Sequence, residues 1–164
     1  MVTEDPPVRR KDKEIQDPGL IDRIMAEAQV CRLGLSRDNV PYIVPVAFGY
    51  DGRTLYFHTA REGTKLDFIA SNPRVCFEVE HEVQVVPNDS AACGWSFSFY
   101  SVIGFGTVEE LTEPAAKVSA LNQVMRHYSH RDWDLNDEAM TKTRLWRIAI
   151  ERITGKQSKD KIVT

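Results

Sequence analysis

The pattern of apolar and polar residues first indicates a helix close to the N-terminus. Asp17 and Pro18 can cap and open a helix, because proline has a helical φ and suits the first turn. Apolar residues then recur at helical spacing, at Leu20, Ile21, Ile24, Met25 and Ala28. We expect this helix to pack its apolar face onto a sheet.

Six later segments have the short apolar or alternating patterns of β-strands. They cover residues 30–36, 42–50, 54–59, 74–86, 96–111 and 145–153. Turns are predicted at Asp38-Asn39 and at Asp51-Gly52, of which the second is a strong hairpin signal. Pro41 and Pro45 indicate edge or bulged positions in the second strand, because proline cannot donate a hydrogen bond to a neighbouring strand.

Helices are few compared with strands. Beyond the first, the pattern predicts helices over residues 62–71 and 113–128 and a short helical turn within 136–143. Strands joined mostly by short turns indicate an antiparallel barrel or open sheet with flanking helices, and not a doubly wound parallel sheet. We expect one domain over residues 1–164, with a polar arm at 1–16 and a polar, mobile tail at 155–164.

Composition and charge narrow the function classes. The chain has 164 residues, 42% of them hydrophobic, and a formal net charge of -3, so no basic field favours nucleic acid or an anionic membrane as a partner. No apolar run approaches the length of a membrane span. Cys31, Cys76 and Cys93 form no Cys-X-X-Cys pair, so we expect buried, reduced thiols, a cytoplasmic location and no metal site.

Candidate chemistry gathers in residues 55–75. There a strand ends in His58-Thr59 and a helix begins near Gly63, so hydroxyls, free backbone N–H groups and a lysine converge at one point. Such a point suits a phosphate dianion, with Arg61 and Lys65 supplying positive charge. The alternative is that Arg61 and Lys65 belong only to the solvated first turn of a helix.

Several segments together resemble a known family. They are CRLGLS at 31–36, PYIVPVAFGY at 41–50, YFHTAREGTK at 56–65, SNPRVCFEV at 71–79, SVIGFGTVEEL at 101–111 and WRIAIERITGKQS at 146–158. Their order and spacing over about residues 8–158 are similar to those of the pyridoxamine 5'-phosphate-oxidase-like, FMN-binding split-barrel proteins. The most similar branch is that of the nitroimidazole-resistance reductases. The resemblance implies an antiparallel, six-stranded split β-barrel.

The resemblance also implies roles for residues of the 55–75 segment. Thr59, Arg61 and Lys65 match family positions that hold the FMN phosphate. His58 matches a histidine near the flavin and the substrate pocket, which makes it the candidate catalytic residue. Trp146 corresponds less closely to a family tryptophan near the flavin ring; a core role is the alternative.

Further flavin contacts are implied on two other strands. Val44, Pro45 and Val46 match a strand whose backbone runs beside the isoalloxazine ring. Ser101 and Val102 match a position that reaches a flavin, commonly across the interface of a homodimer. One departure from the family is that the C-terminal strand lacks the Arg-X-His motif of true pyridoxamine-phosphate oxidases, so vitamin B6 oxidation is not expected.

The activity implied is electron transfer from a donor such as NAD(P)H through FMN, or FAD as an alternative, to a small electron-poor acceptor. Two alternatives remain open: a flavin carrier or sensor without turnover, and a haem-binding split-barrel protein.

The run 95–105 separately favours a homodimer. Trp95, Phe97 and Phe99 share one strand face, while Tyr100 and Val102 share the other, so both faces need cover. The alternative is that helix 113–128 covers the second face within the same chain.

Overall fold

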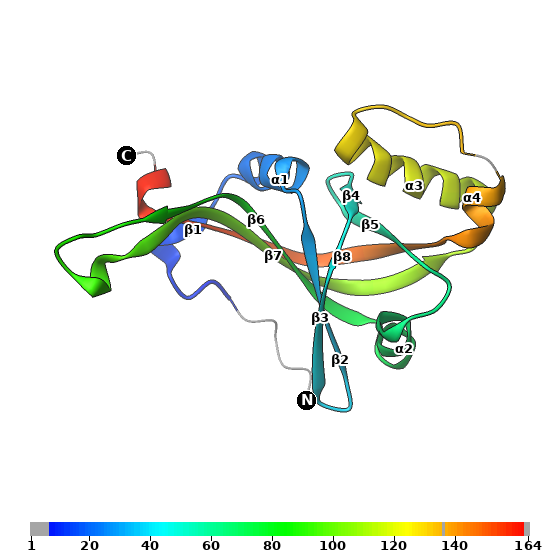
Figure 1. Ribbon diagram of the computed structural model, residues 1–164, viewed down its shortest axis with the longest axis horizontal. Coiled ribbons are helices and arrows are strands. Elements are labelled where there is room, and N and C mark those ends of the chain that lie inside the picture. Colours follow the sequence, from blue (N-terminus) through cyan, green and yellow to red (C-terminus); the bar gives the residue numbers. More distant parts are fainter. Residues whose placement is uncertain (1–6, 136, 163–164) are drawn as a thin grey trace.

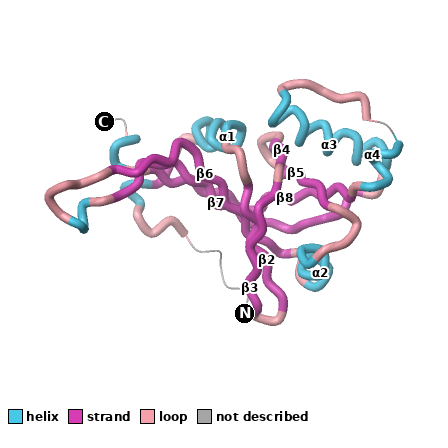
Figure 2. Tube along the Cα trace, viewed as in Figure 1, coloured by secondary structure: helices cyan, strands magenta, loops and turns pink. Residues whose placement is uncertain are grey.

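The computed structural model describes residues 7–135 and 137–162. Its centre is an antiparallel sheet, with helices lying around it (Figures 1 and 2). The strands are β1 (Glu14–Ile15), β2 (Cys31–Arg37), β3 (Val40–Val46), β4 (Phe48–Tyr50), β5 (Thr54–Thr59), β6 (Arg74–Val86), β7 (Ser96–Leu111) and β8 (Arg144–Gln157). The helices are α1 (Pro18–Glu27), α2 (Thr64–Ser71), α3 (Pro114–Ser129) and α4 (Asp137–Lys142), with short 3-10 turns at Lys11–Lys13, Ala92–Gly94 and Lys159–Lys161.

The order of strands explains why the sheet curls. It runs β3-β2-β6-β7-β8-β5-β4, with β1 added beside β8. The two edge strands, β3 and β4, follow each other in the sequence with only Ala47 between them. The edges of the sheet must therefore meet at Ala47, which closes one corner of a barrel and leaves the rest split. The fold is the split barrel that the resemblance implies.

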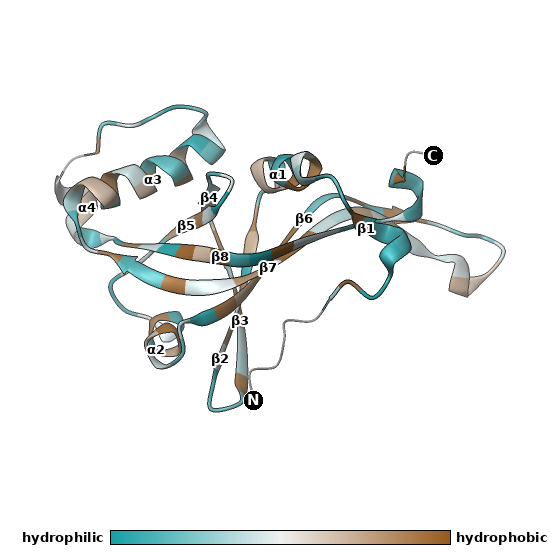
Figure 3. Cartoon of the chain, turned by 180° about the vertical axis from the view of Figure 1, so that it is seen from behind, coloured by the Kyte–Doolittle hydropathy of each residue, from teal (hydrophilic) through white to brown (hydrophobic). Residues whose placement is uncertain are grey.

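Helices cover the sheet on different sides. α1 and α3 lie on one side of the long β7–β8 ribbon and α2 lies on the other, as the two opposite views agree (Figures 1 and 3). Asp17 caps α1 by accepting a hydrogen bond from the Gly19 N–H at 2.9 Å, and Ile24 and Met25 are fully buried, as predicted. α1 packs on β6 and β7, whereas α3 packs on β4, β5 and β8. The alternative in which helix 113–128 covers the 95–105 run is therefore wrong.

Several strand bounds agree with the sequence prediction and two do not. The second predicted strand, 42–50, is broken at Ala47 into β3 and β4, because the chain there crosses from one sheet edge to the other. The arm contributes β1, which pairs with the end of β8. The described part of the chain therefore has eight strands, and not six. β3 lies at an edge, as Pro41 and Pro45 indicate.

The tail is more structured than expected. β8 extends to Gln157, so residues 155–157 are part of the sheet and pair with β7. Ser158 is buried, and its hydroxyl accepts a hydrogen bond from the Phe99 N–H at 3.1 Å. The expectation of a mobile tail is wrong for residues 155–157, because polar side chains do not prevent the backbone from pairing with β7 and β1. Of the predicted helical turn 136–143, Asn136 lies outside the described residues and α4 covers Asp137–Lys142.

Two glycines permit close packing inside the barrel. A Cβ atom at Gly104 would lie 2.1 Å from the Phe77 ring, and one at Gly106 would lie 2.2 Å from the Ala149 carbonyl oxygen. The β7–β8 register also shifts between Phe105 and Gly106. The interruption predicted in this strand is thus a bulge combined with close approach.

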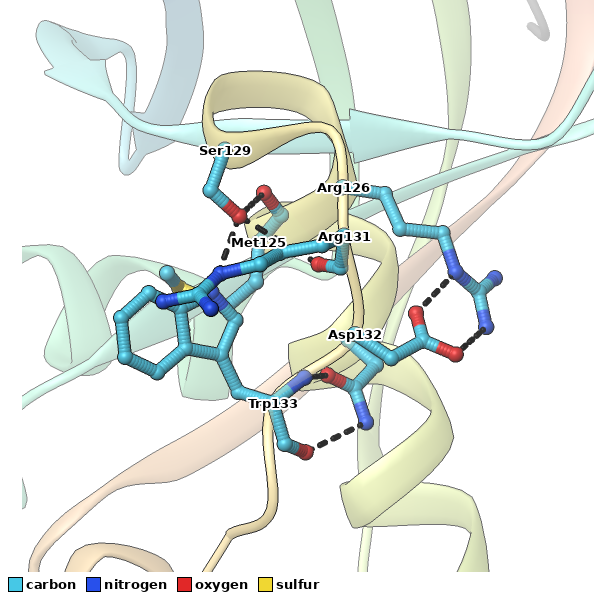
Figure 4. Close-up of polar contacts among 7 residues, drawn as sticks. Met125, Arg126, Ser129, Arg131, Asp132 and Trp133 are labelled. Carbon is cyan, nitrogen blue, oxygen red and sulfur yellow. Dashed lines mark hydrogen bonds and ion pairs between the residues drawn. The ribbon is translucent and has the colours of Figure 1, made fainter.

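The loop after α3 is held by side-chain contacts (Figure 4). Asn122 accepts a hydrogen bond from the Trp133 N–H at 2.8 Å and donates one to the Trp133 carbonyl at 3.2 Å. The Trp133 indole N–H donates to the Ser129 hydroxyl at 2.9 Å, and the Arg131 guanidinium lies 4.1 Å from the centre of the indole ring. These contacts fix the loop against the C-terminal end of α3. Among the described residues, no helix is long and apolar enough to cross a membrane.

Candidate cofactor site

The end of β5 places two of the predicted residues on opposite faces of the sheet. β5 pairs with β8 so that His58 lies opposite Leu145 and Thr59 lies opposite Arg144. Because side chains alternate along a strand, His58 and Thr59 project to different sides. Thr59 is buried with 4% of its surface exposed, whereas His58 is exposed. The two residues are neighbours in sequence, but a single ligand group cannot touch both from one side of the sheet.

The Thr59 hydroxyl is engaged within the protein as both a donor and an acceptor. It donates a hydrogen bond to the Ala60 carbonyl at 2.8 Å and accepts one from the Trp146 indole N–H at 3.0 Å. Trp146 is itself buried, and its ring stacks beside Phe57 with 6.3 Å between ring centres. Trp146 therefore braces the chain where β5 ends and the following loop begins. Direct contacts of Thr59 with a phosphate, and of Trp146 with a flavin, stay predictions.

That loop ends at an uncapped helix start. Gly63 precedes α2 with a φ of 143°, a conformation that favours glycine, and no side chain caps the helix there. The first helical hydrogen bond runs from the Leu66 N–H to the Gly63 carbonyl at 2.8 Å. The N–H groups of Thr64 and Lys65 precede that bond, so they have no acceptor within the helix. This geometry suits an anion, because the N-terminal end of a helix carries partial positive charge.

Two cations flank this helix start. Arg61 is exposed and Lys65 is half-buried, and within residues 7–135 and 137–162 neither has a carboxylate partner. The pKa of His58 is lowered, mainly by partial burial and further by the positive charge of Lys65. Lys65 is thus close enough to His58 to act on its titration. Positive charge without a partner beside free N–H groups fits a phosphate group.

The polar groups that β3 can present to a ligand are backbone N–H and C=O groups. Among the described strands β3 pairs with β2 alone, so its other edge has backbone groups available to a ligand. Val44 and Val46 point towards the core and Pro45 points outwards, as alternation requires. Pro45 and Val46 line a shallow hollow of about 310 Å³ together with Tyr128. An edge strand with apolar side chains could accompany a flat ring, which is the role that the resemblance implies for these residues.

Ser101 and Val102 lie far from the other candidates in the same chain. Ser101 pairs with Lys156, whereas Leu111, ten positions further along β7, pairs with Leu145 beside His58. Ten residues of strand correspond to roughly 33 Å. Val102 is fully buried in the core, so only Ser101 faces outwards. The described chain therefore holds His58, Arg61 and Lys65 within one segment, from the end of β5 to the start of α2, but keeps Ser101 apart from them.

The cysteines only partly match expectation. Cys31 is buried, and that burial raises the pKa of its thiol, as suits an unreactive core residue. Cys76 is half-buried and Cys93 is exposed, so the expectation that all three are buried is wrong for these two. All three are free thiols.

Residues 17–157 of the chain match the pyridoxamine 5'-phosphate oxidase family. The chain belongs to this family. The matched residues include strands β2 to β8. A curated, uncharacterized protein of Rhizobium meliloti (strain 1021) is 36% identical over 56 residues, which is 34% of this chain and 36% of that protein. The match therefore spans about a third of that relative's length.

Solved structures of similar proteins extend the comparison. A candidate 5-nitroimidazole antibiotic resistance protein from Bacteroides thetaiotaomicron VPI-5482 is 30% identical, with a TM-score of 0.77, covering 87% of this chain and 85% of that one. An FAD- and haem-binding protein from Mycobacterium smegmatis is 21% identical, with a TM-score of 0.78, covering 90% and 74%. The flavocytochrome Anf3 from Azotobacter vinelandii is 18% identical, with a TM-score of 0.77, covering 92% and 72%. The last two likenesses concern the fold alone.

Sequence reasoning about this member of the pyridoxamine 5'-phosphate oxidase family missed one supporting contact. The hydrogen bond between Trp146 and Thr59 joins residues 87 positions apart, so no local sequence pattern predicts it. The only signal was that both residues fall on strands predicted to belong to one sheet.

Proposed function

We propose that the protein is a flavoprotein that binds FMN, with FAD as an alternative, and reduces a small electron-poor acceptor. The observation that carries the proposal is the pair of cations, Arg61 and Lys65, at the uncapped start of α2 in a member of the pyridoxamine 5'-phosphate oxidase family. The 30% identity to the Bacteroides protein supports a nitro compound as the acceptor class.

The residues have distinct roles in this proposal. Arg61, Lys65 and the first N–H groups of α2 hold the phosphate, and the edge of β3 at Val44, Pro45 and Val46 lies beside the ring. Trp146 and Thr59 keep the phosphate-binding loop in position through their hydrogen bond. When bound, the flavin supplies the electron transfer, from a donor such as NAD(P)H to the acceptor.

His58 is the proposed catalytic residue. Its lowered pKa keeps the imidazole neutral near pH 7, so the ring can accept or donate a hydrogen bond to the acceptor. It is exposed, and therefore accessible to a small molecule beside the phosphate site.

We also propose that the working unit is a homodimer with each flavin at the subunit interface. Ser101 is too far along β7 to share a flavin with Lys65 of its own chain, so a second copy would have to supply it. The outward face of β7 leaves Phe97 56% exposed, its cross-strand neighbour Val85 is 58% exposed, and α3 packs elsewhere. Exposed apolar side chains of this size on one sheet face favour cover by a partner.

The absorption spectrum of the purified protein tests the cofactor. We expect a flavin spectrum, either as purified or after FMN is added. A haem spectrum with no flavin bound would instead support the haem-binding alternative. Anaerobic reduction by NADH or NADPH, followed by addition of a nitroimidazole, then separates an enzyme from a carrier: reoxidation coupled to loss of the nitro group supports the enzyme, and a flavin that stays reduced supports the carrier.

Sedimentation of the flavin-loaded protein tests the homodimer. Because a ligand that bridges two chains binds the assembled state, added FMN should shift the protein towards dimer at micromolar concentration. A monomer that holds one FMN per chain would contradict the interface site while leaving the cofactor assignment intact.

A further inference from the structure

A second hollow lies on the outward face of the sheet, beneath the N-terminal arm. It has a volume of about 400 Å³, and Val8 and Arg9 of the arm form one wall. Ile103 and Phe105 of β7 form an apolar floor, with Ser101 and Lys156 beside them. The described part of the arm runs along the side of β7 away from α1, the side on which α2 also lies further along the sheet (Figure 1). The volume is within the range of small-molecule sites.

The charges around the hollow are all of one sign. Arg9, Arg10 and Lys156 line it, and no carboxylate does. Arg10 is neutralised by Asp12, to which its guanidinium donates two hydrogen bonds at 2.8 and 2.6 Å. Arg9 and Lys156 have no carboxylate partner within the described parts of the chain.

Acidic side chains on the strands beside the hollow are also engaged. Glu14 of β1 lies opposite Lys156, and its carboxylate binds the Lys11 ammonium at 2.8 Å. Glu80 pairs across β6 and β7 with Ser101, and Glu78 pairs with Ile103. Both carboxylates bind the Arg32 guanidinium, at 3.0 and 3.3 Å. Arg32 neutralises one of these two carboxylates, so the cluster keeps one net negative charge, against the two positive charges that Arg9 and Lys156 bring to the hollow.

We propose that this hollow binds a flat aromatic compound carrying one anionic group, and that such a compound is the acceptor. The apolar floor would take the aromatic ring, because burying its surface on Ile103 and Phe105 removes both from water. The guanidinium of Arg9 and the ammonium of Lys156 would take the anionic group. The assignment as acceptor rests on the proposed function, in which Ser101 meets the flavin held by the partner chain.

Two parts of the chain build the hollow. Its floor lies within residues 17–157, which match the family, whereas residues 7–10 of the arm precede that match and add a wall and a cation.

Two matched ligands test the inference: 4-nitrobenzoate, which is anionic, and 4-nitrobenzamide, which has nearly the same shape without the charge. Their binding is measured by calorimetry on the full-length protein, with and without added FMN. A partly exposed ion pair contributes modestly, so two cations should favour the carboxylate by about five- to tenfold. The preference should shrink as salt is raised, because mobile ions screen exposed charges.

A double variant assigns the preference to the hollow. Arg9→Gln with Lys156→Gln should bring the two ligands to within about twofold of each other, whereas Lys159→Gln, which changes an exposed lysine outside the hollow, should leave the preference intact. Circular dichroism of each variant checks the fold. If the double variant fails to fold, the salt dependence in the unaltered protein decides.

Equal affinities for the two ligands in the unaltered protein, or a preference that survives the double variant, would overturn the inference. Flavin absorbance of the same samples separates this outcome from failure of the proposed function. Bound FMN without carboxylate preference refutes the hollow alone. Carboxylate preference without FMN binding leaves the hollow as an anion site and refutes its role beside a flavin.

Discussion

Replacing Lys65 by alanine should weaken FMN binding and, at the same time, leave the protein at least as stable. The ammonium has no carboxylate partner among the described residues, so its removal leaves no unpaired acid behind. A charge-assisted hydrogen bond contributes about 1.5–3 kcal/mol, so the Kd for FMN should rise roughly ten- to a hundredfold. A lysine in the first turn of a helix opposes the helix dipole, and losing it should stabilise α2 by about 0.3–1 kcal/mol.

The opposite signs make the experiment decisive. FMN affinity is measured by titration of flavin fluorescence, and stability is measured by urea unfolding of the flavin-free protein. Lys159→Ala serves as the control, because it removes an exposed lysine from the 3-10 turn near the C-terminus and should change neither affinity nor stability appreciably. An unchanged Kd in Lys65→Ala would refute the phosphate site at the start of α2. Weaker binding accompanied by lower stability would indicate a structural defect instead.

Three further outcomes are expected. His58→Ala should keep FMN affinity within about threefold, because no phosphate contact is lost, and should slow acceptor reduction in stopped-flow assays; lost flavin with unchanged turnover per bound flavin would reverse that role. Gly49→Ala should lower the free energy of unfolding by about 1–3 kcal/mol, since the new Cβ would lie 2.4 Å from the Gln123 backbone; an unchanged urea midpoint would contradict the packing of α3 on β4. Burial lowers the pKa of His127, so the unfolded chain binds a proton more readily as pH falls below about 6.5. Stability should then decline with falling pH, and His127→Gln should flatten that decline in denaturant titrations.

The local parts of the fold were predictable from the sequence because local forces decide them. Asp17 caps α1 as its position before proline indicates, and Asp38 and Asn39 adopt the positive φ that a tight hairpin turn requires. The break at Ala47 was not predictable in the same way. The run 42–50 is continuous in its β propensity, and only closure of the distant sheet edges interrupts it.

The candidate site was predictable in part for the same reason. Arg61 and Lys65 lie within a few positions of the strand end and the helix start, so the sequence brings them together with little help from the rest of the fold. The engagement of Thr59 by Trp146 depends on the pairing of β5 with β8, which is a long-range contact. The family resemblance implies that both residues contact the flavin. In the structure, the Trp146 indole N–H donates a hydrogen bond to the Thr59 hydroxyl.

The position of β8 has a consequence for how the protein is made. This last strand pairs with β7, β5 and β1, and its partner Glu14 precedes Lys156 by most of the chain. During synthesis β1 and β5 leave the ribosome long before β8 exists. The strand edges that later pair with β8 therefore stay unpaired until then. Such long-range closure is slow and exposes strand edges to association with other chains. A nascent chain halted before Arg144 should therefore be a strong client of ribosome-associated chaperones, and release of the final fourteen-residue strand should end that dependence.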